Sequence, residues 1–207
     1  MPRWSKPVRR SGVSGAGTAD RDYWASLSWP QAKDTIPMGP RSKLSTHYEV
    51  AFEDYLRRRG LPYIAVDEAK KSLFGNAKLK SFDFVVYRPG ATKLLVDVKG
   101  RACRVKSGSV SLPNWATRED IDDLRQWQEI FGESFVAMFV FVYAWVQEPK
   151  DAPFKDLFAF QEKWYSTMAI SVADYRQHMK RRSESWGTVH VGTADFKRLA
   201  KPFDDCL

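Results

Sequence analysis

The chain has 207 residues, of which 43% are hydrophobic and 28% charged, enough for one globular domain with a sizeable core. Its formal net charge of +8 favours an anionic partner, and nucleic acid is the commonest. Two cysteines outside any CxxC pair and three scattered histidines argue against a structural zinc site or a disulfide framework, no apolar run is long enough to span a membrane, and a cytoplasmic location is expected.

Residues 1–41 mix Arg, Lys, Ser, Gly and Pro, a composition that is poor at forming a core and predicts a flexible basic arm. Residues 42–207 are expected to form a single α/β domain. Within it, a core at 45–145 precedes a C-terminal extension at 150–207.

A helix is predicted to open the ordered part of the chain. Either Ser45 or Thr46 can cap it, and Glu49, three residues after Thr46, completes a capping box. Apolar residues recur at helical spacing as far as Leu56, and Gly60 ends the pattern. A short strand is then expected within "LPYIAVD", followed by a Lys- and Gly-rich loop at 70–80.

The stretch "SFDFVVYRPGATKLLVDVKG" predicts an antiparallel hairpin, because two β-rich runs flank a Pro-Gly turn. If paired residues have numbers that sum to 180, Asp83 lies across from Asp97, with Cβ atoms only ~5 Å apart. Asp97 and Lys99 share one face of their strand, since side chains at i and i+2 point the same way. We expect the second strand to stop at Gly100 and a polar loop to fill 101–114.

The remaining elements predict an α/β sandwich around a mixed sheet. Thr117 can cap a helix through Phe131 with Gly132 behind it, and an apolar run follows as a central strand. Further elements are expected as a strand at 157–161, a helix at 172–182, a strand at 188–191 and a helix at 194–200.

Two like charges facing each other across a hairpin repel unless a cation bridges them. Mg²⁺ prefers oxygen ligands and often binds one or two carboxylates, so Asp83, Asp97 and the backbone carbonyl of Val98 are candidate ligands. Such an ion polarises a phosphoryl oxygen and activates a water molecule, and Lys99 can stabilise the negative charge that develops. The pattern therefore favours phosphodiester hydrolysis.

Asp83, followed fourteen positions later by Asp97-Val98-Lys99, resembles the PD-(D/E)xK nuclease superfamily. The resemblance covers roughly residues 45–145 and implies a restriction endonuclease-like α/β/α sandwich with a central mixed sheet, Mg²⁺ or Mn²⁺ as cofactor and DNA as the first-choice substrate. It also implies an acid on the preceding helix, with Glu49 as first choice and Glu53 as second. The proline usual before the first acid is Phe82 here.

The segment "HYEVAFE" at 47–53 also resembles the motif of the bacterial HYExAFE family, whose name implies no activity. Simpler interpretations stay open. Lys99 can be only a salt-bridge partner of Asp97, which leaves Asp83 unexplained, and Glu49 can be only a capping residue.

Several basic residues flank the proposed site in sequence and are predicted to contact nucleic-acid phosphates: Lys78, Lys80, Arg101, Arg104 and Lys106. The alternative function is a non-catalytic module that binds nucleic acid or a protein partner. The sequence does not separate DNA from RNA, and it leaves a homodimer open.

Overall fold

The structure is a computed structural model that describes residues 46–66, 79–90, 92–106, 109–146 and 156–207. The predicted basic arm at 1–41 and most of the predicted loop at 70–80 lie outside these ranges. The elements follow in the order α1 (His47–Arg58), β1 (Tyr63–Ala65), β2 (Phe84–Tyr87), β3 (Lys93–Lys106), β4 (Ser109–Ser111), β5 (Ala116–Thr117), α2 (Arg118–Phe131), β6 (Phe135–Trp145), β7 (Phe158–Phe160), β8 (Lys163–Ser171), α3 (Val172–His178), β9 (Met179–Ser183), β10 (Thr188–Val191), α4 (Thr193–Leu199) and the short 3₁₀ helix η2 (Phe203–Cys206).

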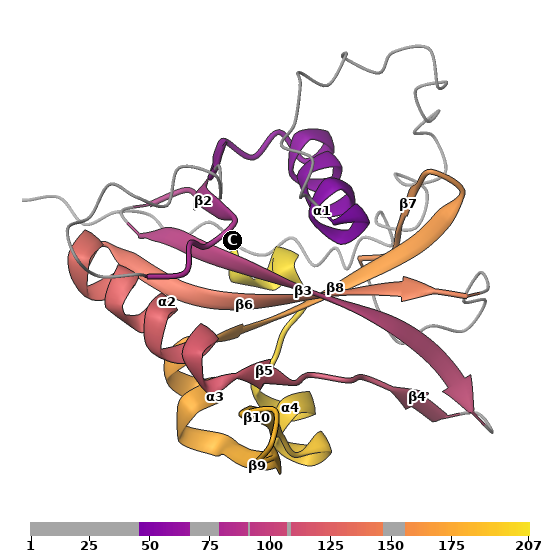
Figure 1. Ribbon diagram of the computed structural model, residues 1–207. Helices are drawn as coiled ribbons and strands as arrows, with labels where there is room; N and C mark the ends of the chain where they lie inside the picture. Colours follow the sequence, from indigo (N-terminus) through magenta and orange to yellow (C-terminus); the bar gives the residue numbers. More distant parts are fainter. Residues whose placement is uncertain (1–45, 67–78, 91, 107–108, 147–155) are drawn as a thin grey trace, which may run out of the picture. The chain divides into compact units, whose positions relative to one another are not determined.

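The central sheet has the strand order β1-β2-β3-β6-β8-β7, and β4 pairs with the far end of β3. β3 and β6 run parallel, whereas their other neighbours pair antiparallel, so the sheet is mixed as predicted. Helix α1 covers one face, and α2, α3 and α4 pack against the other (Figure 1). The fold is therefore the expected α/β/α sandwich. A second sheet has the order β5-β10-β9.

The two faces of the central sheet each bury a separate apolar cluster. Leu94, Val96 and Val98 of β3 point toward α1. Leu95, together with Phe139 of β6, points toward α2 and α3. Burial on both faces explains why β3 and β6 begin as nearly continuous apolar runs rather than alternating ones.

The hairpin pairs in the predicted register, with Phe84 opposite Val96 and Tyr87 opposite Lys93. β2 ends at Tyr87 and β3 begins at Lys93, and between them Gly90 adopts a positive φ of 98°, which an L side chain rarely adopts. The expectation that partner numbers sum to 180 is confirmed for Phe84 to Tyr87, but the ladder ends before the expected Asp83–Asp97 pair, and the Asp83 N–H donates to Val96 O instead.

Both predicted helix starts are confirmed in detail. Thr46 and Thr117 each accept a hydrogen bond from the third residue of their helix, and that residue's carboxylate bonds back to the cap, as a capping box requires. Helix α2 ends at Gly132, whose φ is +86°. In the described part of the chain, no helix has the length and apolar character needed to cross a membrane.

The expected polar loop at 101–114 is wrong, because β3 does not stop at Gly100. Its parallel pairing with β6 continues to Cys103 opposite Trp145, and Arg104 then begins the pairing with β4. Pairing with β6 and β4 thus extends a strand whose own sequence, "RACRVK", lacks a clear strand pattern.

Two further boundaries differ from the prediction. The helix expected at 172–182 ends at His178, since the exposed run that follows pairs with β10 as β9. Strand β8 was not predicted, because Ser166 and Thr167 interrupt its apolar pattern. Both are fully buried and hydrogen-bonded: Ser166 accepts from Trp145 Nε1 at 3.0 Å, and Thr167 donates to Asp156.

Residues of η2 return to the face that α1 covers. The Phe203 ring packs edge-on against Phe52, with ring centroids 5.1 Å apart. The Tyr55 hydroxyl donates to the Asp204 carboxylate, and Arg59 forms an ion pair with the same residue. The C-terminal segment therefore helps to hold α1 against the sheet.

Candidate active site

Asp83 lies at the residue before β2, where the hairpin ladder ends. Its backbone N–H donates to Val96 O at 2.9 Å, and its Oδ2 accepts the Val98 N–H at 2.6 Å. The carboxylate thus takes the place of a strand carbonyl for Val98. This bond fixes Asp83 at the edge of the sheet beside the middle of β3.

Asp97 and Lys99 point together from β3, as predicted. Lys99 Nζ lies 2.9 Å from Asp97 Oδ2 and 3.1 Å from Asp120 Oδ2. All three side chains are nearly excluded from solvent, with exposed fractions of 11%, 11% and 5% for Lys99, Asp97 and Asp120. The ammonium group is therefore held between two buried carboxylates.

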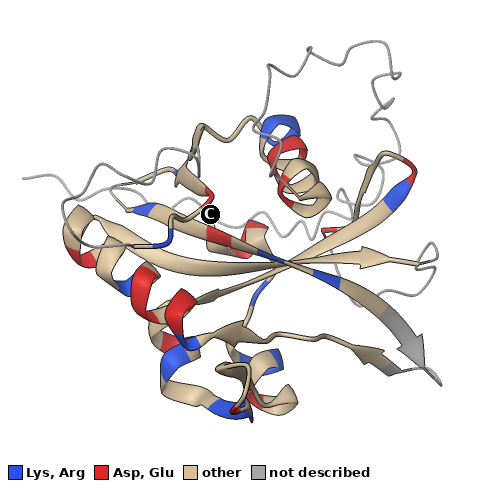
Figure 2. Ribbon diagram, viewed as in Figure 1, with Lys and Arg blue, Asp and Glu red and all other residues tan. Residues whose placement is uncertain are grey.

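Asp120 belongs to the first turn of α2, where acidic residues gather (Figure 2). Its Oδ2 accepts the Thr117 N–H at 3.0 Å, and its carboxylate also forms an ion pair with Lys80. Asp120 was not among the site residues predicted from the sequence. The Thr-x-x-Asp pattern at 117–120 was a legible capping signal, but nothing in it pointed to Lys99.

The carboxylates differ in their electrostatic surroundings. Burial raises the pKa of Asp83 well above its usual range, and the negative charges of Asp97 and Glu49 raise it further. Burial also raises the pKa of Asp97, although Lys99 opposes the rise. Burial acts in the same direction on Asp120, but Lys99 and Lys80 outweigh it and lower the pKa of this carboxyl below its usual range.

The start of α1 is fitted closely to β3. A Cβ atom added to Gly100 would lie 2.1 Å from the Tyr48 ring, so only glycine admits this ring against the strand. His47 Nδ1 lies 3.1 Å from the Tyr165 hydroxyl of β8. These contacts set the position of Glu49, the next residue along the helix.

Glu49 and Glu53 have different surroundings, which bears on the choice between them. Glu49 is partly exposed, bonds back to Thr46, and is one of the charges that raise the pKa of Asp83. Glu53 is buried and accepts hydrogen bonds from Arg57 at 2.7 Å and from Tyr63 at 2.6 Å. The geometry therefore favours Glu49 as the helix acid.

The candidate metal ligands are the carboxylates of Glu49, Asp83 and Asp97 and the backbone carbonyl of Val98. Oxygen ligands of these kinds suit a hard divalent cation. The carboxylates are nevertheless arranged around other partners: Asp83 accepts from Val98, Asp97 binds Lys99, and Glu49 caps α1. Within the described ranges, no three His, Cys, Asp or Glu side chains form a group that could hold a metal ion. Binding an ion would require the carboxylates to come closer together around it.

Of the five predicted phosphate-binding residues, the structure describes the side chains of two. Lys80 bonds to Asp120, and its carbonyl accepts from Trp127 Nε1 at 2.9 Å. The Arg101 guanidinium donates to the Gly100 and Trp115 carbonyls. Both residues thus serve the fold. Three candidates fall outside what the structure describes, by whole residue or by side chain: Lys78, Arg104 and Lys106.

Among solved structures, the chain is similar to Hjc, a Holliday junction resolvase from Archaeoglobus fulgidus, with a TM-score of 0.45 and 15% identity. The match covers 78% of this chain and 98% of that one. Similarity at this level assigns no activity. No protein-family model and no curated protein matches the chain, so the resemblance of "HYEVAFE" to the HYExAFE group stays a prediction.

Proposed function

We propose that this protein is a divalent-metal-dependent nuclease that hydrolyses phosphodiester bonds, with DNA as the first-choice substrate. The observation that supports it best is the convergence of two carboxylates on the middle of β3: Asp83 accepts the Val98 N–H at 2.6 Å, and the adjacent Asp97 has Lys99 Nζ 2.9 Å from its Oδ2. Besides burial, the negative charges of Asp97 and Glu49 raise the pKa of Asp83, so positive charge bound beside these carboxylates would favour the ionised form of Asp83.

The residues proposed to hold Mg²⁺ or Mn²⁺ are Asp83, Asp97 and Glu49, with the carbonyl of Val98. When bound, the ion would polarise the phosphoryl group and lower the pKa of a coordinated water. The chain's own contribution centres on Lys99. Because Asp120 of α2 also binds this ammonium, Lys99 is held in place beside Asp97 and can stabilise charge developing on a phosphate.

The test is a cleavage assay on plasmid, single-stranded and branched DNA and on RNA, with Mg²⁺, Mn²⁺ or EDTA. Asp83→Asn keeps an acceptor for the Val98 N–H, and Asp97→Asn leaves Lys99 its bond to Asp120. Each should reduce cleavage about a hundredfold or more, as should Lys99→Ala. Asp122→Asn, an exposed change on α2, is the matched control and should cleave like wild type.

Equal cleavage by wild type and all three site variants would refute the proposal. The second candidate function is a non-catalytic module that binds nucleic acid or a partner protein. It is favoured by the ion pairs that already occupy Asp97 and Lys99. Wild type that binds DNA yet cleaves no substrate, and shows no Mn²⁺ binding by calorimetry, would support this second candidate.

A cytoplasmic location and a homodimer also remain part of the proposal. Sedimentation of the purified protein with and without DNA measures the oligomeric state directly.

A further inference from the structure

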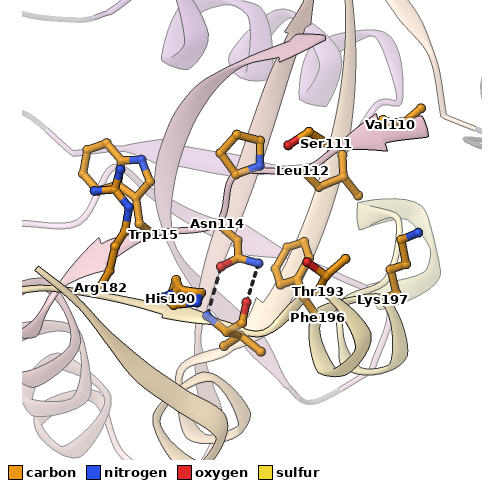
Figure 3. Close-up of a pocket in the computed structure, with 12 residues that line it drawn as sticks. Val110, Ser111, Leu112, Asn114, Trp115, Arg182, His190, Thr193, Phe196 and Lys197 are labelled. Carbon is orange, nitrogen blue, oxygen red and sulfur yellow. Dashed lines mark hydrogen bonds between the residues drawn. The ribbon is translucent and has the colours of Figure 1, made fainter. Parts of the chain in front are cut away.

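A pocket of about 560 Å³ lies between residues 110–115, which lead into β5, and the segment formed by β10 and α4 (Figure 3). This volume falls within the range of pockets that bind small ligands. Its apolar and aromatic wall includes Leu112, Trp115 and Phe196, and its polar lining includes Arg182 and Lys197.

The pocket wall is fixed by buried hydrogen bonds. The Asn114 amide donates to Val191 O and accepts from Val191 N, both at 3.0 Å, as the dashed lines of Figure 3 show. The Tyr175 hydroxyl donates to Asn114 O at 2.7 Å. The two sides of the pocket are thereby tied together, so the cavity is preformed.

The polar lining is cationic. No acidic side chain is among the lining residues, and across the described ranges neither Arg182 nor Lys197 forms an ion pair. Two positively charged side chains therefore line a cavity with an aromatic and apolar wall.

The pocket is connected to the candidate active site along β3. Arg101 follows Lys99 by two residues and so shares its face of the strand. The Arg101 guanidinium lies 3.8 Å from the centre of the Trp115 ring, and that of Arg182 lies 5.2 Å from it. A continuous series of side chains thus leads from Asp97 to the pocket.

We infer that the pocket binds an unpaired nucleotide of the substrate strand. The apolar and aromatic wall suits a base, and Arg182 and Lys197 suit the adjoining phosphates. A base enters such a pocket only when it is out of the stack and unpaired. The inference rests on the proposed nucleic-acid substrate and narrows it to strands with unpaired nucleotides.

The test compares an Arg182→Ala/Lys197→Ala double variant with an Arg176→Ala/Lys201→Ala control. The control removes the same charge from exposed residues outside the pocket. Fluorescence anisotropy with a fluorescein-labelled 15-nucleotide single strand, in EDTA so that nothing is cut, gives the affinity. The same sequence as a blunt duplex gives the reference.

The pocket variant should bind the single strand roughly tenfold more weakly than the control does, and its salt slope should fall by about 1.4, from about 0.7 for each of two phosphate contacts. Its affinity for the duplex should match that of the control. Equal affinities of the two variants for the single strand, or equal losses on strand and duplex, would overturn the inference.

These results are separable from those of the cleavage assay. A wild type that cuts nothing, with a pocket variant that selectively loses the single strand, would reject hydrolysis and support the pocket. A wild type that cuts DNA, with a pocket variant that binds like the control, would support hydrolysis and reject the pocket as a nucleotide site.

Discussion

Asp120→Asn tests whether the carboxylate behind Lys99 stabilises the site by its charge. Asparagine retains an acceptor for the Thr117 N–H, so the helix cap survives while two ion pairs are lost. The expected result is a protein that folds but is less stable than wild type at pH 7, with a difference that shrinks in acid.

The magnitude follows from exposure. The bond to Lys99 is buried on both sides, and losing a hydrogen bond between charged groups costs about 1.5–3 kcal/mol. Lys80 is 44% exposed, so its ion pair adds no more than about 1 kcal/mol. Removing a buried charge beside Asp97 offsets part of the loss, since Asp120 raises the pKa of Asp97. The net decrease in unfolding free energy should be about 2 kcal/mol.

The direction of the pKa shift of Asp120 determines how the stability difference between wild type and Asp120→Asn changes with pH. The folded pKa of Asp120 is lowered, so its stabilisation is complete above the unfolded pKa and is lost as pH falls toward the folded pKa. With an unfolded pKa of about 3.9, the advantage of wild type should be about 1.2 kcal/mol smaller at pH 3 than at pH 7.

Urea unfolding of both proteins at pH 7 and pH 3 measures this difference. Asp122→Asn, an exposed change on the same helix, should stay within about 0.5 kcal/mol of wild type at both pH values. A difference between wild type and Asp120→Asn that is constant or grows in acid would refute the electrostatic reasoning.

Two further substitutions test the packing and the buried charge. Gly100→Ala should destabilise the protein by about 1–3 kcal/mol because its Cβ meets the Tyr48 ring. Tyr48→Ala in the same chain should remove most of that penalty. A double-mutant cycle measured by urea unfolding that shows simple additivity would contradict the close fit between Gly100 and Tyr48. Asp156 is only 2% exposed, and burial raises its pKa. The native protein therefore loses stability as the pH rises through the folded pKa of Asp156. Asp156→Asn should therefore gain in melting temperature relative to wild type between pH 4 and pH 7, and a constant offset would show that the carboxyl does not titrate in this way.

The hairpin was predictable because its register is local. Two β-rich runs joined by a Pro-Gly turn admit few pairings, and the one that buries both apolar faces brings Asp83 to the end of the ladder, where its carboxylate accepts the N–H of Val98, the residue after Asp97. The extension of β3 past Gly100 was not predictable, since it depends on pairing with β6, which lies beyond α2 in the chain.

The surroundings of Lys99 show the same limit. Its pairing with Asp97 follows from spacing within one strand, whereas its bond to Asp120 depends on how α2 crosses the sheet. Likewise, Arg101 was expected to contact phosphate, but its position over Trp115 follows from contact between distant segments. Local patterns therefore predicted that Asp97 and Lys99 lie side by side, whereas the second partner of Lys99, Asp120, depends on tertiary packing.

The packing of η2 on α1 links the candidate site to protein synthesis. The helix that carries Glu49 leaves the ribosome early, yet its contacts with Phe203 and Asp204 can form only after residues 203–206 have been made. The contacts that hold this helix against the sheet from η2 thus form only after translation has passed this segment. A fusion tag or truncation placed near residue 203 would disturb the helix although it lies remote in sequence from the acids.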